Sequence, residues 1–176
     1  MRNIYLLLGI GVLMVTPGCY AEMNGTVVDA ETGVPIEGAV VLVEWTVTKG
    51  MPGMMVTETY EVTEVVSDKE GRVYISGVLN PSVNPPHVTV YKAGYVAWND
   101  EFIFPDYKKR TDFKWQNEYI FKLEKFRPEY THDAHTMFIH GAIHSGMALG
   151  KKDLIKGAIE WEESKAFEER RNKEAK

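Results

Sequence analysis

The sequence predicts a mainly β protein, an antiparallel β-sandwich with a C-terminal helical extension. Between about residues 22 and 125, apolar and polar residues alternate in several short runs, as they do in half-buried strands. Clusters of turn-forming residues separate these runs, and short strands with regular turns favour a sandwich. After Arg127-Pro128 the alternation gives way to the three- and four-residue spacing that is typical of helices.

Four runs supply the predicted strands, and each places its apolar residues on one face by period-two alternation. In chain order these faces consist of Ala39, Val41, Val43, Trp45 and Val47; Val56, Tyr60, Val62 and Val66; Val96, Trp98, Phe102 and Phe104; and Phe113, Trp115, Tyr119, Phe121 and Leu123. Turn signals at 29–33, 67–71 and the proline-rich 80–86 separate the strands.

Two helical segments follow, Tyr130 to Met147 and Lys151 to about Arg170. The second carries an apolar stripe that is suited to docking on the sandwich. The stripe consists of Leu154, Ile155, Ala158, Ile159 and Trp161. Beyond Trp161 the chain is dense in charge, and we expect this tail to fray into solvent. Because the strand pattern is complete by Leu123, we expect residues 22–125 to fold without the helices.

The N-terminus has the features of an export signal. A positive residue, Arg2, precedes an apolar run from Ile4 to Val15, and small Gly18 comes directly before Cys19. The apolar run is shorter than the roughly 20 residues that span a bilayer. The end of this leader resembles the lipobox of a bacterial lipoprotein, in which the cysteine is lipidated and begins the mature chain. Ordinary secretory cleavage near Ala21 is the alternative.

These features divide the chain into a lipoprotein signal peptide at 1–18, a β-sandwich at 19–125 and a helical extension with a charged tail at 126–176. In bacterial lipoproteins, a residue other than Asp after the cysteine directs the protein to the outer membrane. Tyr20 at that position therefore implies an outer-membrane lipoprotein that faces the periplasm or the cell surface.

The composition of the mature chain excludes several kinds of site. Cys19 is the only cysteine, so lipidation leaves no thiol for a disulfide, a nucleophile or a zinc site. The net charge is -5 and falls to -6 once Arg2 is removed with the leader. The sequence also shows no basic stripe, which argues against nucleic acid as a partner.

Three segments resemble, in order, the motifs of carboxypeptidase regulatory-like domains. These segments are Gly25 to Val41, Ser67 to Ile75 and Val88 to Tyr95. The resemblance implies a prealbumin-like sandwich of seven or eight strands that is non-catalytic and serves as an accessory module. Independently of the family, Gly33 and Gly71 occupy turn positions that suit a positive φ.

Four histidines lie between residues 132 and 144. The spacing of His140 and His144 is that of a zinc-protease helix, but a glycine stands where the catalytic glutamate would be, which excludes the protease mechanism. On a helix, Asp133, His140 and His144 share one sector, while His132 and His135 point elsewhere. These three residues are a candidate weak metal site, and a solvated polar face is the alternative.

The sequence Met51-Pro52-Gly53-Met54-Met55 lies in an insertion, Thr48 to Met55, that the family pattern lacks. Thioether sulfurs are ligands that copper(I) favours, so metal handling in the periplasm is one interpretation of this loop. Flexible apolar packing is the other.

Aromatic residues offer a possible sugar-binding surface. Three tryptophans are expected in the core because they fall in the apolar phase of their strands, Trp45, Trp98 and Trp115. Three tyrosines fall outside that phase and are the candidate ligand-binding residues, Tyr91, Tyr95 and Tyr107.

The sequence contains neither a glycine-rich phosphate loop nor a nucleophile elbow, and we expect no catalytic residue and no cofactor. The function that these features favour is a lipid-anchored envelope protein that acts as a structural or protein-binding module. Its partners are expected to be the membrane, through the anchor, and an envelope protein or a glycan. A carbohydrate-binding module and a periplasmic metal-binding protein are the alternatives.

Overall fold

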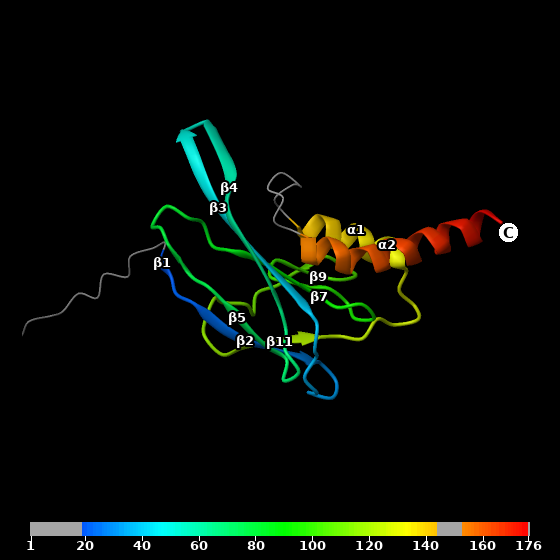
Figure 1. Ribbon diagram of the computed structural model, residues 1–176. Coiled ribbons are helices and arrows are strands. Elements are labelled where there is room, and N and C mark those ends of the chain that lie inside the picture. Colours follow the sequence, from blue (N-terminus) through cyan, green and yellow to red (C-terminus); the bar gives the residue numbers. More distant parts are fainter. Residues whose placement is uncertain (1–18, 144–152, 176) are drawn as a thin grey trace, which may run out of the picture.

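Two sheets form the body of the protein (Figure 1). The computed structural model describes residues 19–143 and 153–175. One sheet has the order β11-β2-β5, with β2 at Met23–Asp29, β5 at Arg72–Ile75 and β11 at Tyr119–Leu123. The other has the order β4-β3-β7-β8, with β3 at Val40–Met51, β4 at Met54–Val66, β7 at His87–Tyr91 and β8 at Trp98–Asn99. The predicted β-sandwich with a C-terminal helical extension is confirmed.

Two short antiparallel pairs complete the strands. β1 at Cys19–Tyr20 pairs with β6 at Val78–Leu79, and β9 at Phe102–Ile103 pairs with β10 at Lys108–Lys109. The pairing of β11 with β2 is parallel, whereas every other pair between named strands is antiparallel. The sandwich is therefore mixed rather than purely antiparallel.

β3 is buried on both faces along its first half. Val41, Val43 and Trp45 point into the core between the two sheets, as the alternation predicts. Val40 and Leu42 point the other way and are also buried, in a second core. A strand with apolar residues on both faces needs cover on both sides, and the second cover comes from the C-terminal helices.

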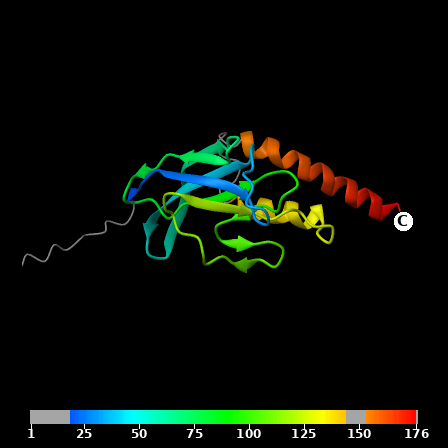
Figure 2. The same cartoon turned by 90° about the horizontal axis from the view of Figure 1, so that it is seen from below.

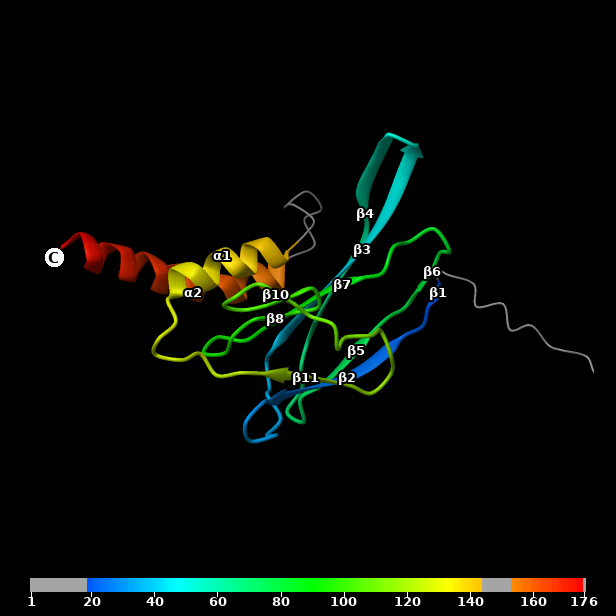
Figure 3. The same cartoon turned by 180° about the vertical axis from the view of Figure 1, so that it is seen from behind.

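The two helices lie along the outer face of the four-stranded sheet (Figures 1 and 3). α1 spans His132–Ala142, with the hydroxyl of Thr131 accepting from the Ala134 N–H as its N-cap. α2 spans Asp153–Glu174, and its first amides donate to the carboxylate of Glu64 on β4. Within residues 19–143 and 153–175, neither helix is long and apolar enough to cross a membrane.

The second core joins these helices to the sheet. Phe138 and Ile139 of α1 and Ile155 and Ile159 of α2 pack against Leu42 and its neighbours. In the predicted stripe of α2, Ile155 and Ile159 are buried, but Leu154 and Trp161 are more than a third exposed. The helices are therefore part of the folded core and not an appendage.

The prediction that the tail frays beyond Trp161 is wrong. α2 continues to Glu174, and Figure 2 shows it extending past the sheets toward the C-terminus. Ala166 is fully buried, and Arg170 lies 2.9 Å from Asp133 of α1. The tail remains helical because α1 supplies contacts along it.

The β3–β4 hairpin projects beyond the rest of the body (Figures 1 and 3). The segment Thr48 to Met55, predicted as an insertion, is its outer end, where Gly50 pairs with Met55 and Met51 with Met54. Positive φ angles are confirmed at Gly33 and Gly71, 71° and 72°. A Cβ at Gly71 would collide with the carbonyl oxygen of Val27, so glycine is also required there for space.

Deleting residues 128–176 should destabilise the sandwich, because Leu42 and Tyr91 are fully buried beneath the helices. Each large apolar side chain that becomes exposed costs about 1.5–3 kcal/mol, against a typical total stability of about 5–15 kcal/mol. We now expect the truncated chain to lose its cooperative thermal transition and to bind apolar dyes, which circular dichroism and dye fluorescence would measure.

The matched control removes only 171–176, where the described side chains are exposed, and should melt like the full chain. A cooperative transition of the shorter chain near the full-length temperature would show that residues 22–125 fold alone.

Candidate functional sites: a buried glutamate cluster and an open sheet edge

The described residues place two of the three predicted metal ligands, Asp133 and His140, on α1. α1 ends at Ala142, and Ile143 has an extended backbone with φ -90° and ψ 97°. His144 itself lies outside the described residues. His140 Nε2 is 3.0 Å from Glu163, and Asp133 pairs with Arg170 on α2.

In residues 19–143 and 153–175, no three or more histidine, cysteine, aspartate or glutamate side chains are grouped so that they could hold a metal ion. Met51, Met54 and Met55 are exposed at the hairpin end, as the loop interpretation expects.

The three candidate tyrosines do not share one platform. Tyr91 is fully buried, which removes it from any surface, because the alternation of β7 is overridden by helices covering its second face. Tyr95 is partly exposed and donates its hydroxyl to Asp29 at 3.2 Å. Tyr107 is half exposed and packs its ring against Phe138 of α1.

A buried carboxylate, Glu162 of α2, lies at the centre of the second core. Its Oε1 is 2.6 Å from Nδ1 of His132, and its Oε2 accepts the hydroxyl of Tyr91 at 2.7 Å. Nδ1 of the fully buried His135 is 2.9 Å from the same Oε1, at an angle outside the hydrogen-bond range. The other ring nitrogen of His135 accepts the Ala97 N–H at 2.9 Å.

The electrostatics of this cluster keep Glu162 ionised. Burial raises the pKa of the Glu162 carboxyl, but its polar contacts with His135, His132 and Tyr91 outweigh this effect, so the pKa lies below its ordinary value. Burial also raises the pKa of Tyr91, whose hydroxyl therefore remains a donor. Because the Ala97 N–H occupies Nε2 of His135, the neutral ring carries its proton on Nδ1, toward Glu162.

The cluster connects the sheet, α1 and α2. Both carboxylate oxygens of Glu162 have partners in the cluster, and the side chains of Glu162 and His135 are at most 1% exposed. Such a closed arrangement positions the helices and leaves little room for a ligand. His132 and His135, which the sequence places away from the metal sector, are thus the histidines with a structural role.

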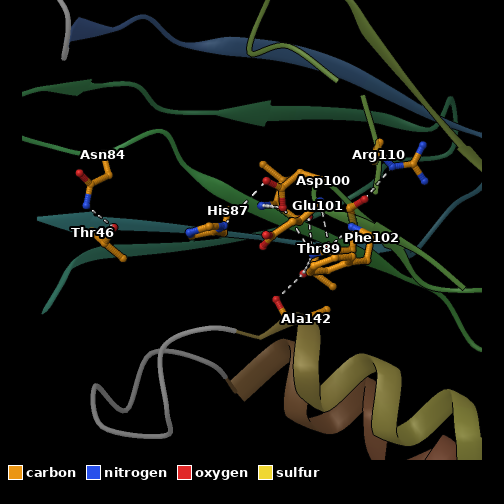
Figure 4. A network of polar contacts seen from close by, with 11 residues as sticks. Thr46, Asn84, His87, Thr89, Asp100, Glu101, Phe102, Arg110 and Ala142 are labelled. Carbon is orange, nitrogen blue, oxygen red and sulfur yellow. Dashed lines mark hydrogen bonds and ion pairs between the residues drawn. The ribbon is translucent and has the colours of Figure 1, made fainter. Parts of the chain in front are cut away.

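A second polar network closes the end of the four-stranded sheet (Figure 4). The side-chain carbonyl of the fully buried Asn99 accepts the N–H groups of Glu101 and Phe102 at 3.0 and 2.9 Å. Asp100 accepts the Val88 N–H at 2.9 Å. Arg110 donates from Nε to the backbone carbonyl of Asn99 at 2.7 Å. This network fixes the position of Arg110.

Arg110 forms one wall of an open groove with a volume of about 550 Å³. Its guanidinium lies 4.6 Å above the ring of Trp98. β11 also lines the groove, and within its sheet it has a paired strand, β2, on one side only. Ile120 of β11 is 52% exposed in this groove. The groove therefore combines an open strand edge with an exposed apolar side chain and a fixed cation.

Charged residues of both signs also line the groove. They include Asp112, Glu118, Lys122 and Glu124. Glu118 adopts a positive φ of 58°, which side chains other than glycine seldom adopt, and this turn directs the chain into β11. Beyond Leu123 the strand edge is covered, because the Val96 N–H donates to the Glu124 carbonyl at 2.7 Å.

Comparisons with known proteins give few matches. No family model matches the chain, and no curated protein matches it. A streptococcal ancillary pilin of known structure aligns over 63% of this chain and 30% of its own, with 20% identity and a TM-score of 0.34. 3-Chlorocatechol 1,2-dioxygenase from Rhodococcus opacus aligns over 64% of this chain and 62% of its own, with 15% identity and a TM-score of 0.39. The chain thus spans less than two thirds of either protein.

Replacing Glu162 with Ala should lower the free energy of unfolding by about 3–5 kcal/mol, because it leaves the Tyr91 hydroxyl and His132 Nδ1 without their partner in the buried cluster. Glu163 offers a matched control, since it pairs with His140 but both side chains are about half exposed. Glu163→Ala should cost less than about 1 kcal/mol. Urea denaturation would measure both, and equal losses would contradict a special role for Glu162.

The stability should also fall in mild acid. Because the folded pKa of Glu162 lies below its ordinary value of 4.5, its contribution is present above that value and is lost as the pH falls through the folded pKa. The stability gap between the wild type and Glu162→Gln should therefore be widest at neutral pH and should narrow as the pH falls below 4.5. Urea midpoints across this range would test it, and a gap independent of pH would contradict the ionised state.

Proposed function

We propose that this chain is a lipid-anchored module of the bacterial cell envelope that binds an extended segment of a partner protein. The anchor in this proposal is Cys19, in the lipobox-like sequence at the end of the leader, and the position of Tyr20 favours the outer membrane. Cys19 is already part of β1, where it pairs with Leu79. An anchor at this residue would hold the sandwich next to the bilayer without an intervening linker.

The carboxypeptidase regulatory-like resemblance belongs to this proposal. Its support is local: Gly33, Gly71 and Gly94, which lie in the three motif segments, all adopt positive φ angles. These motifs build turns and supply no catalytic group. The proposal accordingly assigns a binding role and no reaction.

The observation that carries the binding role is the open edge of β11 beside the groove. A strand edge presents unpaired N–H and C=O groups, and an extended peptide can pair with them and add a strand to the sheet. Ile120 supplies an apolar contact for the bound peptide. Arg110 and the carboxylates around it would select peptides whose side chains carry the complementary charges.

A protein partner fits the groove better than a glycan. Sugar rings stack on exposed aromatic faces, but Trp98 is only 4% exposed and its ring is already covered by Arg110. The histidine segment supports a metal role less well, since His140 and Asp133 are paired with residues of α2.

Replacing Cys19 with Ser should abolish lipid attachment, and the protein should accumulate as an unprocessed precursor or in the soluble fraction. Several acyl chains hold a protein firmly, whereas one chain alone exchanges. Labelling with radioactive palmitate, followed by membrane fractionation, would measure this. A Cys19→Ser protein that is processed and membrane-bound like the wild type would refute the lipid anchor.

The partner site is testable with a photo-crosslinking amino acid at Ile120 in living cells. Tyr74 is a matched control, because it lies on β5 at the other edge of the same sheet and is 55% exposed. We expect a discrete protein adduct from position 120, weakened by Arg110→Ala, and none from position 74. Adducts of equal yield at both positions, or at neither, would count against the groove.

A further inference from the structure

The outer end of the β3–β4 hairpin is apolar and uncharged. From Gly50 to Thr57 no residue carries a charge. Four large apolar side chains there are exposed by 59–74%, Met51, Met54, Met55 and Val56. Exposed apolar groups gathered at a projecting tip are a feature of surfaces that contact a partner or a membrane.

This hairpin tip, defined as Gly50 to Val56, lies at the same end of the molecule as Cys19. The ring of Tyr20, next to the cysteine, is 5.1 Å from that of Trp45 on β3. From Trp45 to Met51 the strand advances by about 20 Å. Figures 1 and 2 both show the tip and the start of β1 at one end, opposite the C-terminus of α2.

The strand that carries Cys19 adds to the apolar character of this end. Leu79, the partner of Cys19 in the β1–β6 pair, is 87% exposed. Leu79 therefore lies directly beside the anchoring position, and the hairpin tip supplies a second apolar group. Together they can contact the membrane surface at two separate points.

The backbone of the tip is suited to a polar–apolar boundary. Met51 pairs with Met54 and Gly50 with Met55, so the groups that face across the hairpin are satisfied internally. The backbone N–H and C=O groups on the outward edges of the hairpin remain, and water in the headgroup region of the bilayer can hydrogen-bond to them. Methionine side chains are flexible and adapt to a fluid surface.

We propose that the hairpin tip inserts into the interfacial region of the lipid bilayer that holds the anchor. This inference rests on the proposed lipidation of Cys19, which keeps the tip within reach of lipid at high effective concentration. A second contact would stop the sandwich from rotating freely about its anchor and would direct the helices away from the membrane.

The single native cysteine makes the test direct, because lipidation of Cys19 leaves an engineered thiol as the only reactive one. The lipidated mature protein carrying Met54→Cys is labelled with an environment-sensitive fluorophore. It is then reconstituted in vesicles of phosphatidylethanolamine and phosphatidylglycerol that contain acyl-chain quenchers. Met137→Cys is the matched control, since Met137 is 66% exposed on α1 and Met54 is 74% exposed.

We expect lipid quenching of the Met54 probe to exceed that of the Met137 probe at least three-fold. Equal quenching in a protein whose lipidation is verified by mass spectrometry would overturn the inference while leaving the anchor intact. A Met54 probe that is shielded from water but not quenched by lipid would also overturn it, in favour of a second copy or a partner protein.

If Cys19 proves not to be lipidated, the proposed anchor fails, and the tip is then tested without it. A Cys19→Ser, Met54→Cys chain, mixed with the same vesicles, should still show quenching above that of Cys19→Ser, Met137→Cys. The absence of that difference would overturn the inference independently of the anchor.

Discussion

Burial of β3 on both faces is the constraint from which the arrangement of the other elements follows. Val41 and Val43 fill the core between the sheets, so the three-stranded sheet must lie on that side. Leu42 faces the opposite way and requires a further layer. Only the two helices supply it among the described elements. Glu64 of the neighbouring β4 then receives the first amides of α2, which fixes where that helix begins.

Apolar contacts alone would define the position of α2 poorly, because side chains such as Ile155 and Ile159 can slide along a smooth sheet. Glu162 adds a directional constraint. A buried carboxylate is costly unless it is fully paired, and only one register of α2 brings it to Tyr91 and to the histidines of α1 at once. We interpret the cluster as the feature that selects this register.

Period-two alternation identifies the inner face of β3 correctly, because it reports directly which side chains enter the core. The prediction for β4 is wrong, since Val56, Tyr60 and Val66 are exposed and only Val62 of that face is buried. Alternation also fails for Tyr91, since it indicates one buried face and β7 has two. The sequence also fails to predict the histidine pairing, because Asp133 and His140 meet residues of α2 that are more than twenty positions away. One signal was available: Ile155, Ile159, Glu162 and Ala166 are spaced by three or four residues, which places the glutamate on the buried face of α2.

The same constraint limits where the protein can meet other molecules. The outer face of the four-stranded sheet is occupied by the helices, so it has little surface to offer. The three-stranded sheet keeps its outer face and the free edge of β11, with Ile120 exposed there. The projecting hairpin leaves the body altogether and exposes Met54 at its tip. Burial of β3 thus leaves the edge of β11 and the hairpin tip as the sites for binding. In our proposal the tip contacts the membrane, because Cys19 lies beside the base of the hairpin.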